Sequence, residues 1–528
     1  MSSSPNSYAA RFSRLRLPKL CVAVIGDDPA ELVEKAEGLV RDNPFLEFRL
    51  DYLKNPASAV PKIKKFFETH MDATVIATCR RVQNGGRFKG SLTAQLDVLL
   101  KAAAAGCQIV DIELETAQGL KPGDLDKLRG KASLLLSYHD FKHTRKIDET
   151  FAKMKTFAAD FYKLVTTATS LHDNVLMMRF LQENHDRYSL IGLCMGEQGI
   201  ISRVLGLRAG SVFTFASAGR GEETGPGQIT AQELRTIYRI DSVDPATRVY
   251  GVAGDPIEHS LSPLMMNAAF RRESVNAVYL ALHAKKIDDL IACMRDIPLS
   301  GISVTMPYKE EILGELDKTD PLSAQIGACN TVIRGQDGRL FGFNTDVSGV
   351  VGPLEQQVGL SGSRVLVLGA GGAAKAAVFG AKARGADVFI LNRTPAEGQK
   401  LAKKAHAKSI KRTDLAKLQF DVIINATPVG MGGNGQTPLT DKELNAKYIF
   451  DLVYNPLETK LLATAKAKGL HAISGLEMFV QQGAQQFEIW TGKPAPTAEM
   501  RMVVMHELET RAAANQNGNG KAKAKKPI

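Results

Sequence analysis

Eight short apolar runs rich in β-branched residues recur through the first 220 residues, and a helical pattern follows each of them. Runs of this kind predict buried strands, and their regular alternation with helices predicts parallel β-α units. Eight such units are typical of a (β/α)8 barrel, where active-site side chains lie at the C-terminal ends of the strands. The runs are Leu20–Gly26, Phe45–Tyr52, Ala73–Arg80, Gln108–Leu114, Ala132–Asp140, Phe161–Thr167, Tyr188–Gly196 and Ser211–Ala218.

The barrel rule selects polar residues at the predicted strand ends. They are Glu47 and Arg49 on the second strand, Arg80, Glu113, His139 and Lys163 on the next four, Arg203 after the seventh and Gly219–Gln228 after the eighth. A lysine among apolar neighbours loses solvation for its ammonium, which favours the nucleophilic neutral amine. An isolated Lys163 would be read as a side chain that snorkels to solvent. His139, one strand earlier, favours a catalytic role for Lys163, because a histidine there can move protons.

A second α/β unit follows the polar, proline-containing segment 241–247, which predicts a short linker. Within it, Arg364–Ala374 reads as a strand, a glycine turn and the start of a helix, the beginning of a Rossmann domain. About 20 residues on, an NAD enzyme carries an acid for the ribose. Asn392, Arg393 and Thr394 stand there instead, and an arginine suits the 2′-phosphate of NADP.

Several motifs of the first half are those of one enzyme family. With Glu47-Phe-Arg49, Ser137-Tyr-His139-Asp140, Phe161-Tyr-Lys163, Gly196–Arg203 and Pro226-Gly-Gln228, the chain from residue 20 to about 230 resembles the type I 3-dehydroquinases. The resemblance implies that Lys163 forms an imine with the substrate ketone, that His139 transfers protons and that no metal is needed. It assigns substrate binding to Glu47, Arg49, Arg80, Arg203, Thr224 and Gln228.

This half departs from the family pattern at two positions. Asn84 stands where the family usually has a glutamate, and Thr224 replaces a serine of the lid. Because an amide does not ionise, a carboxylate that would orient His139 and raise its basicity is missing.

A second set of motifs covers residues 249 to about 510. Gly254–Pro263, Ser303–Lys309, Gly327–Thr331, Asn344–Asp346, Asn425–Pro428, Asp451–Pro456 and Gly475–Gly483 resemble shikimate dehydrogenase. A ketone that takes hydride at carbon must receive a proton on oxygen, and the pair Lys309 and Asp346 can supply it. The resemblance implies substrate binding by Ser260, Ser262, Thr305, Asn330, Tyr454 and Gln482. It implies NADP binding by Gly369, Ala370, Gly371, Gly372, Ala373, Asn392, Arg393, Thr394, Thr427 and Gly475.

The expected fold class is α/β throughout. An N-terminal (β/α)8 barrel precedes a two-domain shikimate dehydrogenase unit, which has an α/β substrate domain and a Rossmann NADP domain. The expected ranges are 1–18 for a disordered N-terminus, 19–240 for the barrel, 241–247 for the linker, 248–358 for the substrate domain with helices of 476–512 completing it, 359–475 for the Rossmann domain and 513–528 for a disordered basic tail.

Composition excludes several other classes of protein. The net charge is +11, but several of the excess positive charges lie in the two expected disordered ends, so we expect no nucleic-acid partner. No run is long enough for a membrane span. The six cysteines are scattered, with no Cys-x-x-Cys pair, and predict neither a disulfide framework nor a metal site. A reducing compartment, the cytoplasm, is expected, with a plastid as the alternative because the start is rich in serine and arginine.

The two resemblances imply consecutive reactions in one chain. The first half would convert 3-dehydroquinate into 3-dehydroshikimate, and the second half would reduce that product to shikimate. One alternative is a transcriptional regulator that resembles both enzymes, against which the retained Lys163, His139, Lys309 and Asp346 argue. The other is a catabolic dehydrogenase that uses quinate and NAD. Arg393 argues against NAD, while quinate stays open.

Overall fold

A computed structural model describes residues 17–121, 123–257, 260–297, 299–433 and 435–523, and of 514–523 the backbone alone. The expected N-terminal segment up to residue 16 and the end of the tail, 524–528, lie outside the described residues, as do Glu258 and His259. The chain divides into two compact units. The first unit consists of the chain up to Arg248, which includes the barrel, and a short segment that runs from Leu282 to just before Leu299. The second unit consists of Val249–Ala281 and the chain from Leu299 onward.

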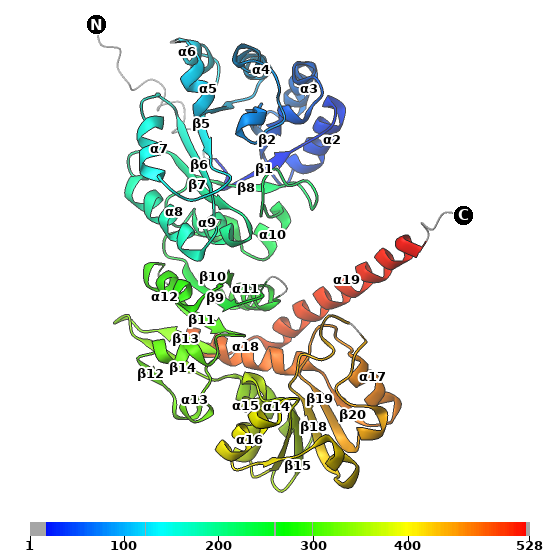
Figure 1. The fold of residues 1–528 in the computed structure, drawn as a ribbon. Coiled ribbons are helices and arrows are strands. Elements are labelled where there is room, and N and C mark those ends of the chain that lie inside the picture. Colours follow the sequence, from blue (N-terminus) through cyan, green and yellow to red (C-terminus); the bar gives the residue numbers. More distant parts are fainter. Residues whose placement is uncertain (1–16, 122, 258–259, 298, 434, 524–528) are drawn as a thin grey trace. The chain divides into compact units, whose positions relative to one another are not determined.

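The eight predicted strands are present and lie parallel to one another, which confirms the barrel (Figure 1). Ladders join them in the order β7-β6-β5-β4-β3-β2-β1-β8, and the N–H of Val212 closes the circle on the carbonyl of Leu190 at 2.8 Å. The strands are β1 Leu20–Val24, β2 Phe45–Arg49, β3 Thr74–Thr78, β4 Ile109–Glu113, β5 Ser133–His139, β6 Phe161–Thr167, β7 Leu190–Met195 and β8 Thr214–Ser217. The helices of this part are α2 Pro29–Val40, α3 Val60–Thr69, α4 Leu92–Ala104, α5 Leu114–Gly119, α6 Asp124–Arg129, α7 Ile147–Met154, α8 Leu171–Asn184, α9 Ile200–Leu205 and α10 Ala231–Thr236.

The interior of the barrel has an apolar floor. Phe45 and Phe213 pack edge to face with ring centroids 4.8 Å apart, and Ile109 and Phe161 belong to the same buried cluster. Successive residues of a strand point to opposite faces, so the residue two positions after each floor residue also faces inward. On β2, β4 and β6 these next residues are Glu47, Asp111 and Lys163. Polar side chains therefore stand directly above the apolar floor.

The predicted linker packs against the barrel. Val243 is buried, and its carbonyl accepts a 2.7 Å hydrogen bond from Lys19 Nζ. Arg208 Nε donates to the carbonyl of Thr247 at 3.0 Å. The polar sequence of 241–247 does not reveal these contacts, because backbone carbonyls accept them.

The second unit has two six-stranded sheets. The first has the order β10-β9-β11-β13-β14-β12, with β11 parallel to β9 and antiparallel to β13. Its strands are β9 Arg248–Gly254, β10 Ala277–His283, β11 Leu299–Val304, β12 Lys318–Thr319, β13 Thr331–Arg334 and β14 Leu340–Phe343, and the helices in this stretch are α11 Ser262–Arg272, α12 Ile287–Asp296, α13 Pro321–Ile326 and α14 Asp346–Glu355.

The second sheet is parallel, in the order β17-β16-β15-β18-β19-β20 typical of a Rossmann domain. Its strands are β15 Arg364–Leu368, β16 Asp387–Leu391, β17 Lys408–Ser409, β18 Phe420–Asn425, β19 Ala446–Asp451 and β20 His471–Ile473, with helices α15 Gly372–Ala383, α16 Pro395–Lys404 and α17 Lys460–Ala467.

Two C-terminal helices, α18 (Gly475–Thr491) and α19 (Thr497–Lys523), return to the first sheet of this unit (Figure 1). Trp490 of α18 stacks on Tyr250 with centroids 5.1 Å apart, and its Nε1–H donates to the carbonyl of Val332 at 3.1 Å. Helix α19 ends at Lys523, so it continues into the range expected for a disordered tail.

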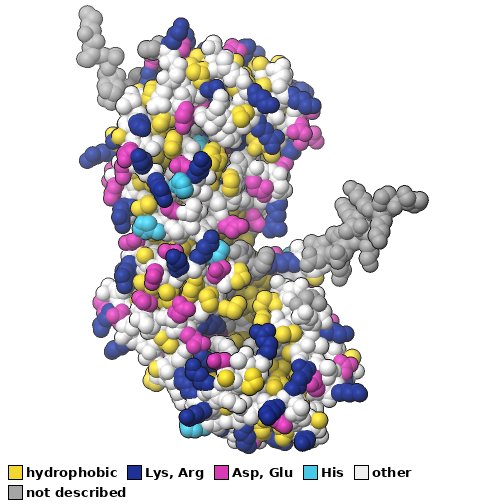
Figure 2. All heavy atoms as spheres, in the orientation of Figure 1, with side chains coloured by type: hydrophobic (Ala, Val, Ile, Leu, Met, Phe, Trp, Pro, Cys, Tyr) yellow, Lys and Arg dark blue, Asp and Glu magenta, His cyan; other side chains and the backbone are white. Residues whose placement is uncertain are grey.

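Charged side chains of both signs are interspersed on the face shown in Figure 2. Among the residues that the structure describes, no helix combines the length and apolar character that crossing a bilayer requires.

Candidate active sites

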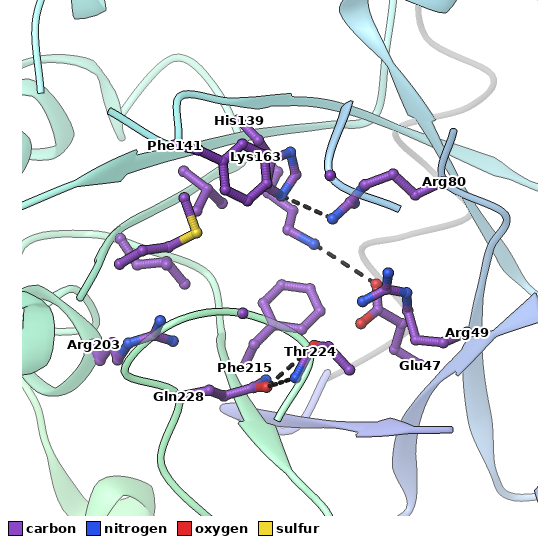
Figure 3. Close-up of a pocket in the computed structure, with 15 residues that line it drawn as sticks. Glu47, Arg49, Arg80, His139, Phe141, Lys163, Arg203, Phe215, Thr224 and Gln228 are labelled. Atoms are coloured by element: carbon purple, nitrogen blue, oxygen red, sulfur yellow. Dashed lines mark hydrogen bonds and ion pairs between the residues drawn. The ribbon is translucent and has the colours of Figure 1, made fainter. Parts of the chain in front are cut away.

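The C-terminal ends of the barrel strands surround a pocket with about 470 Å³ of empty space, part of which is open to solvent (Figure 3). Eight of the predicted residues line it: Glu47, Arg49, Arg80, His139, Lys163, Arg203, Thr224 and Gln228. Apolar lining comes from Phe141, Val165, Leu193, Met195 and Phe215. The fold thus brings together side chains from β2 through the loop after β8. Glu113 and Asn84 are not among the lining residues.

Lys163 of β6 lines the cavity and is 4% exposed. Its Nζ lies 3.3 Å from Asp111 Oδ2, 3.7 Å from Glu47 Oε1 and 3.7 Å from the centroid of the Phe215 ring. Two carboxylates and an aromatic face therefore compensate its charge. The apolar residues next to Lys163 in the sequence predicted an amine without nearby opposite charges. They do not reveal the two carboxylates and the aromatic ring that the other strands contribute.

His139 ends β5 and is held by one hydrogen bond. Nη1 of Arg80 lies 3.0 Å from its Nε2, and its Nδ1 is buried without a hydrogen-bond partner among the described residues. Burial lowers the pKa of His139 well below its ordinary value. The positive charges of Arg80, Lys163 and Arg49 lower that pKa further. The imidazole is therefore neutral at neutral pH and can accept a proton.

Asp111 is a site residue that the sequence analysis missed. It accepts hydrogen bonds from Ser137 Oγ at 2.6 Å and Arg80 Nη2 at 2.8 Å, in addition to its contact with Lys163. Burial by itself raises the pKa of Asp111, but its positive neighbours lower that pKa more, so it is ionised. Glu113, which the strand-end rule selected instead, accepts from Gln95 Nε2 and the N–H of Arg81.

The three arginines of the cavity differ in how their charge is balanced. Arg49 forms a bidentate pair with Asp51 at 3.0 and 2.9 Å, and Arg80 pairs with Asp111. Arg203 is 3% exposed and has no carboxylate partner among the described residues; its Nη2 donates to the carbonyl of Pro226 at 3.0 Å, and its Nε is unpartnered. Burial lowers the pKa of Arg203 to about 10. A buried cation without a carboxylate partner is chemically suited to pair with an anion.

The loop after β8 covers one side of the cavity. Gln228 Oε1 accepts hydrogen bonds from the N–H and the hydroxyl of Thr224, at 2.7 and 3.1 Å. Gly227 has φ +67°, and a Cβ there would lie 2.3 Å from the carbonyl oxygen of Gly196. Only glycine allows this close approach, which places Thr224 and Gln228 at the cavity.

In the second unit, Lys309 and Asp346 form a direct ion pair. Lys309 follows β11, and Asp346 is the first residue of α14, so two elements distant in sequence meet here. Asn330 is buried and donates from Nδ2 to Asp346 Oδ1 at 2.8 Å. The predicted pair and the amide are therefore one connected group.

The other predicted substrate residues lie on neighbouring elements of this unit. The N–H of Ser262 points to Ser260 Oγ at 3.3 Å, and Tyr454 hydrogen-bonds to the backbone of Leu261 between them. Tyr454 stacks on Phe479 with centroids 4.4 Å apart. The N–H of Thr305 donates to the carbonyl of Ala253 at 2.9 Å, and Gln482 Nε2 donates to the carbonyl of Phe479 at 2.8 Å.

The turn after β15 fits a dinucleotide phosphate. Gly369 has φ +113°, and Gly371, at the N-cap of α15, offers no side-chain cap to the first N–H groups of the helix. No atom lies within 4 Å of where a Cβ of Gly371 would be, so the space beside the turn, which also includes Ala370 and Ala373, is open. A Cβ on Gly372 would lie 3.0 Å from Lys309 Cδ, so the predicted catalytic lysine borders the turn.

The remaining predicted cofactor residues follow three strands of the parallel sheet, β16, β18 and β20. Asn392 donates to the carbonyl of Thr394 at 2.9 Å after β16, and Arg393 is exposed beside them. Thr427 Oγ1 donates to Asn425 Oδ1 at 2.7 Å after β18. Gly475 is the first residue of α18.

These folds and sites define a two-enzyme chain, a lyase-type barrel joined to a dehydrogenase. The sequence profile of type I 3-dehydroquinase matches residues 20–245. The profiles of the shikimate dehydrogenase substrate binding domain, the shikimate/quinate 5-dehydrogenase and the shikimate 5′-dehydrogenase C-terminal domain match residues 252–332, 354–443 and 475–505.

Three known proteins illustrate the likeness. The chloroplastic bifunctional 3-dehydroquinate dehydratase/shikimate dehydrogenase of Arabidopsis thaliana is 34% identical over 505 residues, covering 90% of this chain and 82% of the relative. The shikimate dehydrogenase (NADP(+)) of Methanosarcina acetivorans is 41% identical over 278 residues, covering 50% and 99%. The Thermus thermophilus shikimate 5-dehydrogenase, solved with NADP(H) and shikimate, is 35% identical with a TM-score of 0.46, covering 49% and 99%. The chain belongs to the family of bifunctional 3-dehydroquinate dehydratase/shikimate dehydrogenases, enzymes of the shikimate pathway.

Proposed function

We propose that the barrel dehydrates 3-dehydroquinate to 3-dehydroshikimate and that the second unit reduces this product to shikimate with NADPH. The observation that carries the first half is a single cavity holding a buried lysine, a neutral histidine and an unbalanced arginine, Arg203. An amine, a base and an anion site are what a ketone-bearing carboxylate needs for elimination through an imine.

In the barrel, the amine of Lys163 attacks the ketone carbon, and loss of water gives an imine. His139 removes a proton from the carbon next to the imine carbon, which leaves an enamine. The enamine then expels the hydroxyl at the adjacent carbon as water, and the proton on His139 goes to that leaving oxygen. Hydrolysis of the imine frees Lys163 and the enone product, so the net change is the loss of one water. Arg203 holds the substrate carboxylate throughout.

Asp111 and Glu47 place two carboxylates beside the lysine. Both carboxylates lie within 3.7 Å of Nζ and stabilise the ammonium and the positively charged imine alike. The site therefore holds the counter-ions of the positively charged imine before that imine forms.

In the second unit, Lys309 and Asp346 act on the ketone oxygen. NADPH supplies a hydride to the ketone carbon when it is bound. Lys309 donates the proton that the resulting oxygen requires, and Asp346 stabilises the ammonium and holds Lys309 in place. Ser260, Ser262 and Tyr454 offer hydroxyls to the substrate carboxylate, while Thr305, Asn330 and Gln482 hold its ring hydroxyls.

The choice of NADPH over NADH rests on Arg393. Its exposed guanidinium follows β16, where a carboxylate would bind ribose hydroxyls and repel a 2′-phosphate. No group of three or more residues suited to hold a metal occurs among the described residues, and the proposed steps use none.

We place the chain in the cytoplasm, with a plastid as the alternative. The six cysteines are buried and unpaired in the described structure, which suits a compartment that keeps thiols reduced.

One assay tests both reactions. The pure chain is incubated with 3-dehydroquinate and NADPH while enone absorbance and NADPH loss are followed together. We expect the enone to form first and NADPH to decline as it is consumed. Enone formation without NADPH loss would reject the second half. In a parallel incubation with NADH, faster consumption of NADH than of NADPH would reject the cofactor. Quinate with NADP⁺ as the only substrates tests the catabolic alternative.

A further inference from the structure

A buried residue of α18 is connected to the catalytic pair by hydrogen bonds. Gln486 is 2% exposed, and its Oε1 accepts from Ser303 Oγ at 2.7 Å. Its Nε2 donates to Thr331 Oγ1 at 3.0 Å and to the backbone carbonyl of Asn330 at 3.2 Å. Ser303 in turn lies 2.6 Å from the hydroxyl of Tyr279. Every member of this group is buried, so none can exchange its partner for water.

The direction of each hydrogen bond follows from the chemistry of the groups. A backbone carbonyl only accepts, so the Gln486 nitrogen faces Asn330 and its oxygen faces Ser303. Thr331 Oγ1 accepts from that nitrogen and keeps its own proton for Asn330 Oδ1, 2.8 Å away. With Oδ1 occupied by this donor and by the N–H of Thr345, the Asn330 nitrogen points to Asp346.

We propose that Gln486 is a positioning residue of the dehydrogenase, which fixes the orientation of the Asn330 amide and through it the carboxylate of Asp346. This inference rests on the proposed role of Lys309 and Asp346. If the Asn330 amide turned over, its oxygen would face the Asp346 carboxylate, and two acceptors would oppose each other. Gln486 contacts Asn330 itself only at the backbone carbonyl, acts on the Asn330 side-chain amide through Thr331, and has no hydrogen bond to Lys309 or Asp346.

The position is specific to one face of α18. Gln482, one turn earlier, has its side chain on the carbonyl of Phe479, and Gln485 accepts a hydrogen bond from Ser348. Gln481 is half-buried beside Gly352 of α14, outside the group just described. Gln481 is therefore a matched control for a change of the same residue type on the same helix.

Two variants separate polarity from packing. Gln486→Met keeps the length of the side chain and removes both polar ends. Gln486→Glu keeps the shape but replaces the donor nitrogen with an acceptor, so Thr331 loses the partner that directs its proton to Asn330. We measure kcat and KM for shikimate oxidation with NADP⁺, the thermal midpoint, and the dehydratase rate of the same chain.

For both variants we expect kcat to fall about tenfold, with the KM for NADP⁺ unchanged, because one buried donor is worth about that factor in rate. Thr331→Val should give a similar loss. Because Gln486 and Thr331 act in series on the side-chain amide of Asn330, Gln486→Met combined with Thr331→Val should be no slower than the slower single variant. Gln481→Met should stay within about twofold of the unchanged chain.

Several results would overturn the inference. They are an unchanged kcat in both Gln486 variants, losses that multiply in the double variant, or a rise in KM for shikimate without a fall in kcat. If Gln486→Met does not fold, Thr331→Val and Gln486→Glu decide the question by the same criteria. An unchanged chain that does not oxidise shikimate at all would reject the proposed function instead.

Discussion

The guanidinium of Arg80 donates a 3.0 Å hydrogen bond to Nε2 of His139. A guanidinium cannot accept, so this contact requires the Nε2 lone pair and places the proton of the neutral ring on Nδ1. The lone pair that would take a substrate proton is therefore occupied before the substrate binds. Arg80 must release it, and its second contact, with Asp111, gives the guanidinium an anchor while it does so.

The imine proposal predicts a covalent adduct on Lys163. Borohydride added with 3-dehydroquinate should reduce the imine and leave a stable adduct, because only an imine between amine and ketone is reducible in this way. Mass spectrometry of a proteolytic digest locates the modified residue. The adduct should be absent in Lys163→Ala. It should remain in Lys142→Ala, which changes an exposed lysine next to the cavity residue Phe141. An adduct on another lysine would refute the assignment.

Removing the charge of Arg80 should shift the pH dependence of dehydration. The pKa of His139 is lowered first by burial and then by Arg80, Lys163 and Arg49. Because the pKa of His139 lies well below its ordinary value in the unchanged chain, kcat should be flat around neutral pH and fall only in more acidic solution. Arg80→Gln removes one positive charge, which raises the pKa of His139 and should move the acid limb to higher pH.

The measurement is the kcat profile between pH 4.5 and 8. Arg87→Gln, the same change at an exposed arginine, should leave the limb where it is. An acid limb that does not move in Arg80→Gln would show that Arg80 does not set the charge of His139.

Replacing Arg203 should weaken substrate binding without destabilising the fold. The side chain is buried with no carboxylate partner, so it is costly in the free protein and favourable only when an anion is present. Arg203→Met should raise KM for 3-dehydroquinate roughly ten- to a hundredfold, since charge-assisted contacts contribute about 1.5 to 3 kcal/mol. The thermal midpoint should not fall. A lower midpoint with unchanged KM would make Arg203 a structural residue that only holds the carbonyl of Pro226.

The cofactor choice can be tested at Arg393. Arg393→Ala should lower kcat/KM for NADPH roughly ten- to a hundredfold, by loss of a contact to the 2′-phosphate of about 1.5 to 3 kcal/mol. The value for NADH should change little. Equal losses with both cofactors would mean that Arg393 supports the local fold, and Arg384→Ala, which removes an arginine paired with Glu355 elsewhere on the domain, is the control.

The architecture and most of the site followed from local patterns. The barrel was predictable because each strand is an apolar run with its own helix, and parallel β-α units have few ways to pack. Lys309 and Asp346 were predictable from the chemistry of a ketone reduction and from the motifs that contain them. These are properties that a segment carries in its own residues, whatever it later contacts.

The sequence alone determined which side chains the strands and loops present, and the tertiary structure decided which of them meet. Glu113 is in register with Ser137, and Ser137 with Lys163, yet Asp111 is the carboxylate that contacts both. The strands of a barrel are tilted, so residues paired along the ladder do not lie at the same height inside it. The sequence likewise did not show which arginine charges are balanced by a carboxylate. Asp51 pairs with Arg49, whereas no carboxylate among the described residues pairs with Arg203.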